Sequence, residues 1–135
     1  MAAVGARSAT VCSVVAAAEL ADDVGEQRAE HGEAYRERLQ ARAAAHHLDR
    51  VHFDDRYLSN AELHEIVQAA AVVLLPYDSR EQVTSGVLIE AVAAGKPVVS
   101  TAFPHAVELL SGGAGLLVDR QDPAAIADAL RRVFT

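Results

Sequence analysis

The chain has 135 residues, with 12 lysines and arginines against 19 aspartates and glutamates, so its net charge is −7. Lys96 is the one lysine and the arginines are scattered, so no basic stripe is present that would bind a nucleic-acid backbone. With 51% hydrophobic and 23% charged residues, the chain is expected to fold as one compact domain rather than remain disordered.

The cysteine content and the N-terminal segment both bear on where in the cell the protein is expected to be. Cys12 is the one cysteine, which excludes an internal disulfide and a zinc site built from cysteines. Residues 2–18 are mildly apolar, but they contain Arg7 and are too short and polar for a membrane span or a secretory signal. The sequence therefore predicts a cytoplasmic protein without a membrane span and without a nucleic-acid partner.

The first part of the chain gives a weaker pattern. Residues 10–15 are predicted as a short strand, although the segment from 10 to 18 also fits the start of a helix. Residues 26–47 are rich in alanine, arginine and glutamate, which favours a long helix. Residues 1–30 are therefore treated as an N-terminal segment of strand or helix, and residues 31–135 as the main domain.

From residue 51 onward, four short apolar runs alternate with amphipathic segments. This alternation is typical of βαβ units, and unbroken Val/Leu runs are typical of parallel strands that are covered on both faces. The predicted fold class is α/β: a doubly wound, Rossmann-like parallel sheet with helices on both faces. The predicted strands are 51–53, 72–75, 97–100 and 115–118.

Capping residues mark where two of the helices begin. Ser59 and Glu62 have the spacing of a capping box, which predicts a helix over 60–70. Asp122 followed by Pro123 gives an N-cap and a first helical residue, which predicts a last helix that runs to Phe134.

A polar loop and a capped helix separate the predicted strands 72–75 and 97–100. Thr84 or Ser85 is the expected cap, and free backbone N–H groups at Ser85, Gly86 and Val87 would then form a phosphate site. Glu90, one to two turns along this helix, is placed to reach a ribose diol. From these residues alone an alternative stays open, in which Gly86 only permits close packing and Glu90 is a solvated carboxylate.

The run Glu-Ala-Val-Ala-Ala-Gly-Lys-Pro-Val-Val at 90–99 is the most specific motif. Together with segments 103–110 and 115–118, it resembles the C-terminal, donor-binding half of retaining nucleotide-sugar glycosyltransferases of the GT-B type, in the group 1 family. The resemblance covers residues 31–134. It implies transfer with retention from a UDP- or GDP-linked sugar, with no cofactor and no divalent metal.

The resemblance also implies roles for individual residues. The family carries two glutamates eight positions apart: the second binds the ribose hydroxyls, and the first faces the donor sugar. Glu90 matches the second, while Gln82 stands at the first, catalytic position, where its amide can still hydrogen-bond sugar hydroxyls. The residues matching the family's diphosphate-binding and base-binding segments are Thr84, Ser85, Gly86 and Val87, and Arg56, Tyr57 and Leu58, respectively.

Two parts of the family's pattern are expected to be missing. No acceptor domain is present in these residues, and residues 2–30 show no glycine-containing loop with an arginine and a lysine for the diphosphate. Two functions follow as expectations. One is a glycosyltransferase component that works with an acceptor domain on another chain. The other is a non-catalytic remnant or interaction module that keeps the scaffold and self-associates or binds a partner.

Overall fold

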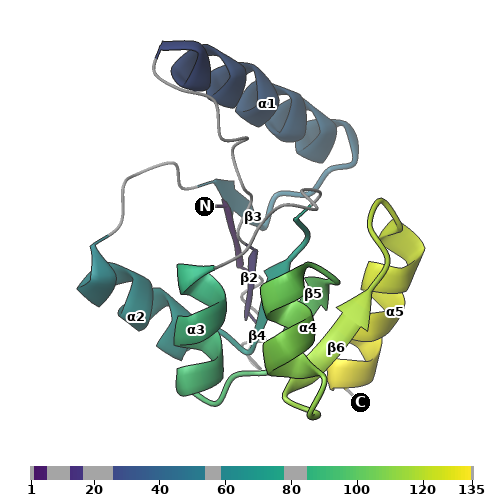
Figure 1. The fold of residues 1–135 in the computed structure, drawn as a ribbon. Coiled ribbons are helices and arrows are strands. Elements are labelled where there is room, and N and C mark those ends of the chain that lie inside the picture. Colours follow the sequence, from purple (N-terminus) through teal and green to yellow (C-terminus); the bar gives the residue numbers. More distant parts are fainter. Residues whose placement is uncertain (1, 6–12, 17–25, 54–58, 78–84, 135) are drawn as a thin grey trace.

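The structure, a computed structural model, describes residues 2–5, 13–16, 26–53, 59–77 and 85–134. A six-stranded sheet runs through it in the order β3-β1-β2-β4-β5-β6 (Figure 1). The strands are β1 (Ala2–Gly5), β2 (Ser13–Ala16), β3 (Val51–Phe53), β4 (Val72–Leu75), β5 (Val98–Thr101) and β6 (Gly115–Val118). The helices are α1 (Glu26–Ala45), α2 (Asn60–Ala69), α3 (Gly86–Ala93), α4 (Pro104–Leu110) and α5 (Pro123–Phe134).

The parallel part of the sheet confirms the predicted α/β class. Strands β2, β4, β5 and β6 are parallel to one another, with Val73 opposite Val98 and Val99 opposite Leu116. Strand β5 begins one residue later than predicted because Pro97 has no N–H group to donate to the ladder. Its carbonyl still accepts from the N–H of Val73 at 2.9 Å.

Strand β1 was not predicted, and it makes the sheet mixed. It lies antiparallel between β2 and β3, so β3 is separated from the main parallel ladder. Its sequence, Ala-Ala-Val-Gly, has one β-branched residue and no apolar run, so neither propensity nor periodicity indicates a strand there. The predicted strand at 10–15 is found at Ser13–Ala16, and the long helix predicted over 26–47 is α1.

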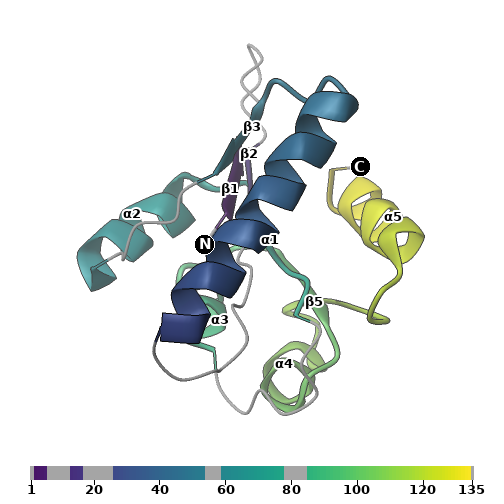
Figure 2. The ribbon, with the colours of Figure 1, turned by 90° about the horizontal axis from the view of Figure 1, so that it is seen from above.

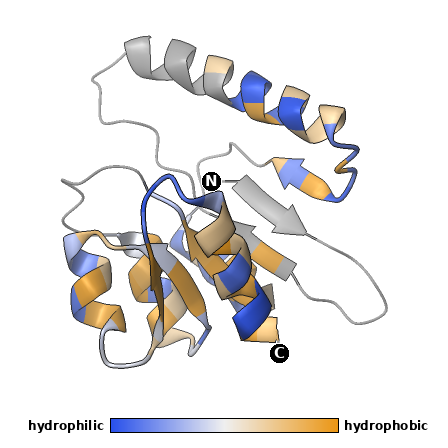
Figure 3. Cartoon of the chain, turned by 90° about the vertical axis from the view of Figure 1, so that its right-hand side faces the viewer, coloured by the Kyte–Doolittle hydropathy of each residue, from blue (hydrophilic) through white to orange (hydrophobic). Residues whose placement is uncertain are grey.

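Helices cover both faces of the parallel sheet, as predicted. Alternate residues of β4 point to opposite faces. Val73 and Leu75 pack in a core with α2, α3 and α4, whereas Val72 packs in a second core with α5. Figure 2 shows α2 and α5 on opposite sides of the strands. Helix α1 contacts β3 and has a mostly polar sequence, and hydrophilic and hydrophobic segments alternate along its coloured part in Figure 3.

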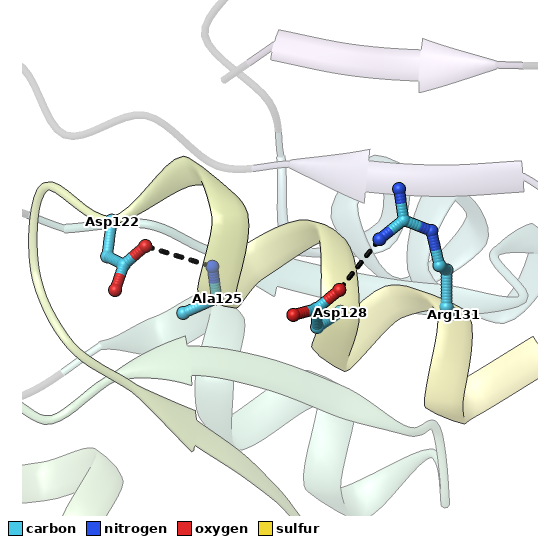
Figure 4. A network of polar contacts seen from close by, with 4 residues as sticks. All are labelled: Asp122, Ala125, Asp128 and Arg131. Carbon is cyan, nitrogen blue, oxygen red and sulfur yellow. Dashed lines mark hydrogen bonds and ion pairs between the residues drawn. The ribbon is translucent and has the colours of Figure 1, made fainter.

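The predicted helix caps are confirmed. The Oγ of Ser59 accepts the N–H of Glu62 at 3.2 Å. At α5, the Oδ1 of Asp122 accepts the N–H of Ala125 at 3.0 Å, as Figure 4 shows. Further along α5, Arg131 and Asp128 form an exposed ion pair of 2.7 Å. Pairs this exposed contribute little to stability, so Asp128 serves as a control position below.

Candidate functional site

The candidate site lies where β4 and β5 end and the next helices begin. Tyr77 follows β4 and Ser85 caps α3, while Phe103 follows β5 and His105 lies in the first turn of α4. Helices α3 and α4 stand side by side along the sheet (Figure 1). Open α/β sheets bind ligands at the carboxyl ends of their strands, and the start of α3 lies at this edge of the sheet.

Ser85 is buried and is the N-cap of α3. It is 4% exposed, and its Oγ accepts the N–H of Leu88 at 3.2 Å. The same Oγ lies 3.2 Å from the hydroxyl of Tyr77, so the cap is bonded to the end of β4 as well. This confirms Ser85 as a cap, while Thr84, the other expected cap, lies outside the described residues.

The backbone N–H of Ser85 is not free, contrary to the prediction. It donates to Nδ1 of His105 at 3.1 Å. The prediction was wrong because this contact joins residues 20 positions apart, which no local pattern indicates. For the N–H groups of Gly86 and Val87, the described residues provide no hydrogen-bond acceptor, as expected in the first turn of a helix.

Gly86 faces open space. A Cβ built on it would meet no heavy atom of the described residues within 4 Å, so close packing against them does not explain the glycine. The residue is exposed and follows directly after the buried cap. A ligand can therefore approach the backbone at this position closely, which is one of the uses of glycine at binding sites.

A buried polar and aromatic cluster supports the start of α3. The hydroxyl of Thr101 donates to the carbonyl of Tyr77 at 2.7 Å, which ties the end of β5 to the segment after β4. The rings of Tyr77 and Phe103 pack with their centroids 5.2 Å apart at an angle of 48°. Because these three residues are buried, their contacts fix the position of the backbone around the α3 N-terminus.

Glu90 lies on α3 and contacts α2. Its Oε2 is 3.3 Å from Nδ1 of His64, with the Glu90 side chain 32% exposed and that of His64 56% exposed. The sequence did not indicate this contact, since it joins residues 26 positions apart. A carboxylate can accept several hydrogen bonds, so the contact leaves capacity on Glu90 for a ligand hydroxyl.

Five other predicted site residues lie outside the described residues. The structure does not describe Gln82, Thr84, Arg56, Tyr57 or Leu58, so their roles stay predictions. Within the ranges that are described, no group of three or more His, Cys, Asp or Glu side chains is arranged to hold a metal ion. In the same ranges, no helix combines the length and the apolar character needed to cross a membrane.

Comparison with known proteins identifies the family. The family model for glycosyl transferases group 1 matches residues 11–135. The chain belongs to this family. A D-inositol 3-phosphate glycosyltransferase of Corynebacterium urealyticum is 44% identical to this group 1 glycosyl transferase chain over 75 residues. The match spans 55% of the chain but only 17% of that relative. No solved structure matches the chain.

Proposed function

We propose that the chain binds a nucleoside diphosphate-sugar, UDP- or GDP-linked, as the donor for retaining glycosyl transfer. An acceptor domain outside this sequence would complete the active site. The observation that carries this proposal is the open backbone face of Gly86 at the start of α3, on the carboxyl edge of the sheet in a chain of the group 1 family.

The first turn of α3 supplies the diphosphate contacts in this proposal. The N–H groups of Gly86 and Val87 point out of the helix N-terminus, where the helix dipole favours negative charge. When the glycosidic bond to the diphosphate breaks, negative charge builds up on the leaving phosphate oxygens. Donors fixed in advance stabilise that charge without needing to reorganise. Ser85 contributes by capping and fixing this turn.

Glu90 is proposed to bind the ribose, and Gln82 the donor sugar. A carboxylate accepts hydrogen bonds from two neighbouring ribose hydroxyls, and His64 holds one of its oxygens on the α2 side. An amide at Gln82 both donates to and accepts from sugar hydroxyls. Arg56, Tyr57 and Leu58 are proposed to contact the base, and Thr84 the diphosphate.

Glu90→Ala is expected to weaken the binding of UDP or GDP by about 1–3 kcal/mol, because the ribose hydroxyls lose a charged acceptor. Isothermal titration calorimetry on the purified chain would measure the loss. Asp128→Ala removes a carboxylate from the exposed ion pair on α5 and should bind nucleotide like wild type. Equal effects of the two substitutions would contradict the assignment of Glu90.

Gly86→Ala is expected to raise the stability of the folded chain and to lower its affinity for nucleotide. The added methyl group meets nothing in the described structure, and alanine restricts the unfolded chain, so stability should rise by about 0.4–1 kcal/mol. In contrast, the methyl group stands where the diphosphate would approach, so nucleotide affinity should fall. Urea unfolding followed by circular dichroism and a nucleotide titration measure the two effects. Unchanged affinity would argue against a diphosphate at this turn.

Thermal unfolding with and without UDP, GDP and their sugar conjugates tests the donor site as a whole. Ligand at ten times its Kd stabilises a folded protein by about 1.4 kcal/mol, which raises the Tm by several degrees. A shift selective for one nucleotide would support the proposal and identify the base. A cooperative transition with no shift would instead favour a non-catalytic module that keeps the scaffold.

A further inference from the structure

His105 joins the start of α4 to the start of α3. It is the second residue of α4, and its Nδ1 accepts the backbone N–H of Ser85 at 3.1 Å. The ring is half-buried, and Ser85 itself is 4% exposed. The first N–H groups of a helix have no acceptor within it, and here a side chain from the neighbouring helix takes one of them.

This contact sets the protonation pattern of the neutral imidazole. A ring nitrogen that accepts a hydrogen bond carries no proton, so the proton of neutral His105 lies on Nε2. Ser85 is now bonded on three sides. Its Oγ contacts Tyr77 at the end of β4 and the N–H of Leu88 within α3, and its N–H contacts α4. The imidazole of His105 therefore links the α3 N-terminus to α4.

We propose that His105 is a positioning residue for the donor diphosphate, an inference that rests on the proposed function. By holding the Ser85 N–H, the imidazole orients the first turn of α3, so that the N–H groups of Gly86 and Val87 are aimed together at the ligand. The Ser85 N–H is then not a ligand contact. The donor is recognised through two backbone N–H groups whose direction depends on a histidine of the next βα unit.

Three substitutions at His105 test the role of the Nδ1 acceptor. His105→Ala removes the acceptor and should weaken UDP or GDP binding by about 5- to 10-fold, the loss of one hydrogen bond. His105→Asn places an amide oxygen close to the position of Nδ1 and should restore affinity to within about twofold of wild type. His105→Gln extends its oxygen beyond that position and should behave like His105→Ala. His46→Ala, an exposed histidine one residue past α1, should change nothing.

Nuclear magnetic resonance on the nucleotide-free protein tests the contact separately from ligand binding. An N–H···N hydrogen bond gives a scalar coupling between the Ser85 amide nitrogen and Nδ1 of His105, and a long-range proton–nitrogen spectrum reports the proton on Nε2. Absence of both signals overturns the inference whether or not nucleotide binds. Circular dichroism checks that each variant is folded. If His105→Ala does not fold, the comparison of nucleotide affinity between His105→Asn and His105→Gln decides the test.

The outcomes separate this inference from the proposed function. If wild type binds nucleotide and His105→Ala binds it equally well, the positioning role is overturned and the donor site stands. The role is also overturned if His105→Asn binds nucleotide as weakly as His105→Ala, because the hydrogen-bond acceptor would then be restored without restoring nucleotide affinity. If wild type binds neither UDP nor GDP while the coupling is present, the proposed function fails and the positioning role fails with it.

Discussion

Replacing Phe103 by alanine is expected to destabilise the folded chain by about 3–5 kcal/mol, the range for large-to-small changes at fully buried aromatic positions. Phe103 is 1% exposed, and its ring packs against Tyr77 at a centroid distance of 5.2 Å. It also stands directly before α4, so the cavity would form beneath the turn that carries His105. Urea unfolding followed by circular dichroism measures the loss.

The same substitution is expected to weaken nucleotide binding in the protein that remains folded, because His105 and Tyr77 both lose their support. Phe134→Ala provides a matched control at the end of α5, where the phenylalanine is 44% exposed. Its effect should stay below about 1 kcal/mol, as is usual for surface positions. If both variants lost similar stability, Phe103 would not be the packing centre that the geometry indicates.

The elements that the sequence predicted well are those whose signal is local. Strands β3, β4 and β6 begin and end where their apolar runs do, and Ser59 and Asp122 cap the helices that they were expected to cap. Burial on both faces forces a strand to be apolar throughout, as in β4, whereas β3 and β6 each have one exposed residue and show only a short apolar run. An N-cap needs a side-chain oxygen at one position. Both requirements concern only a few consecutive residues, so they can be recognised in the sequence.

The contacts that the sequence did not reveal are those made between elements. His105 bonds Ser85 from 20 residues away, and His64 contacts Glu90 from 26 residues away. A histidine in an amphipathic segment gives no sign of which neighbour it will meet, because this depends on how the helices pack on the sheet. The family resemblance identified the segment that forms the candidate site, and tertiary packing decided which of its N–H groups remain available.

Gly115→Ala is expected to destabilise the chain by about 3 kcal/mol, at the upper end of the usual cost of overpacking. A Cβ at Gly115 would lie 2.4 Å from the carbonyl oxygen of Val98, its partner in the parallel pairing of β5 with β6, and 3.2 Å from Cδ2 of Leu110. Because the closer atom belongs to the backbone of a buried strand, relief requires β6 to shift relative to β5.

Gly112→Ala is the matched control for this effect. It lies three residues earlier, and a Cβ there meets no atom of the described residues within 4 Å, so the stability of this variant should differ from wild type by less than about 0.5 kcal/mol. Gly115 opens β6, at the end of the sheet opposite the candidate site. Nucleotide affinity of folded Gly115→Ala should therefore match wild type. A Gly115→Ala variant as stable as Gly112→Ala would show that β5 and β6 do not approach as closely as the pairing requires.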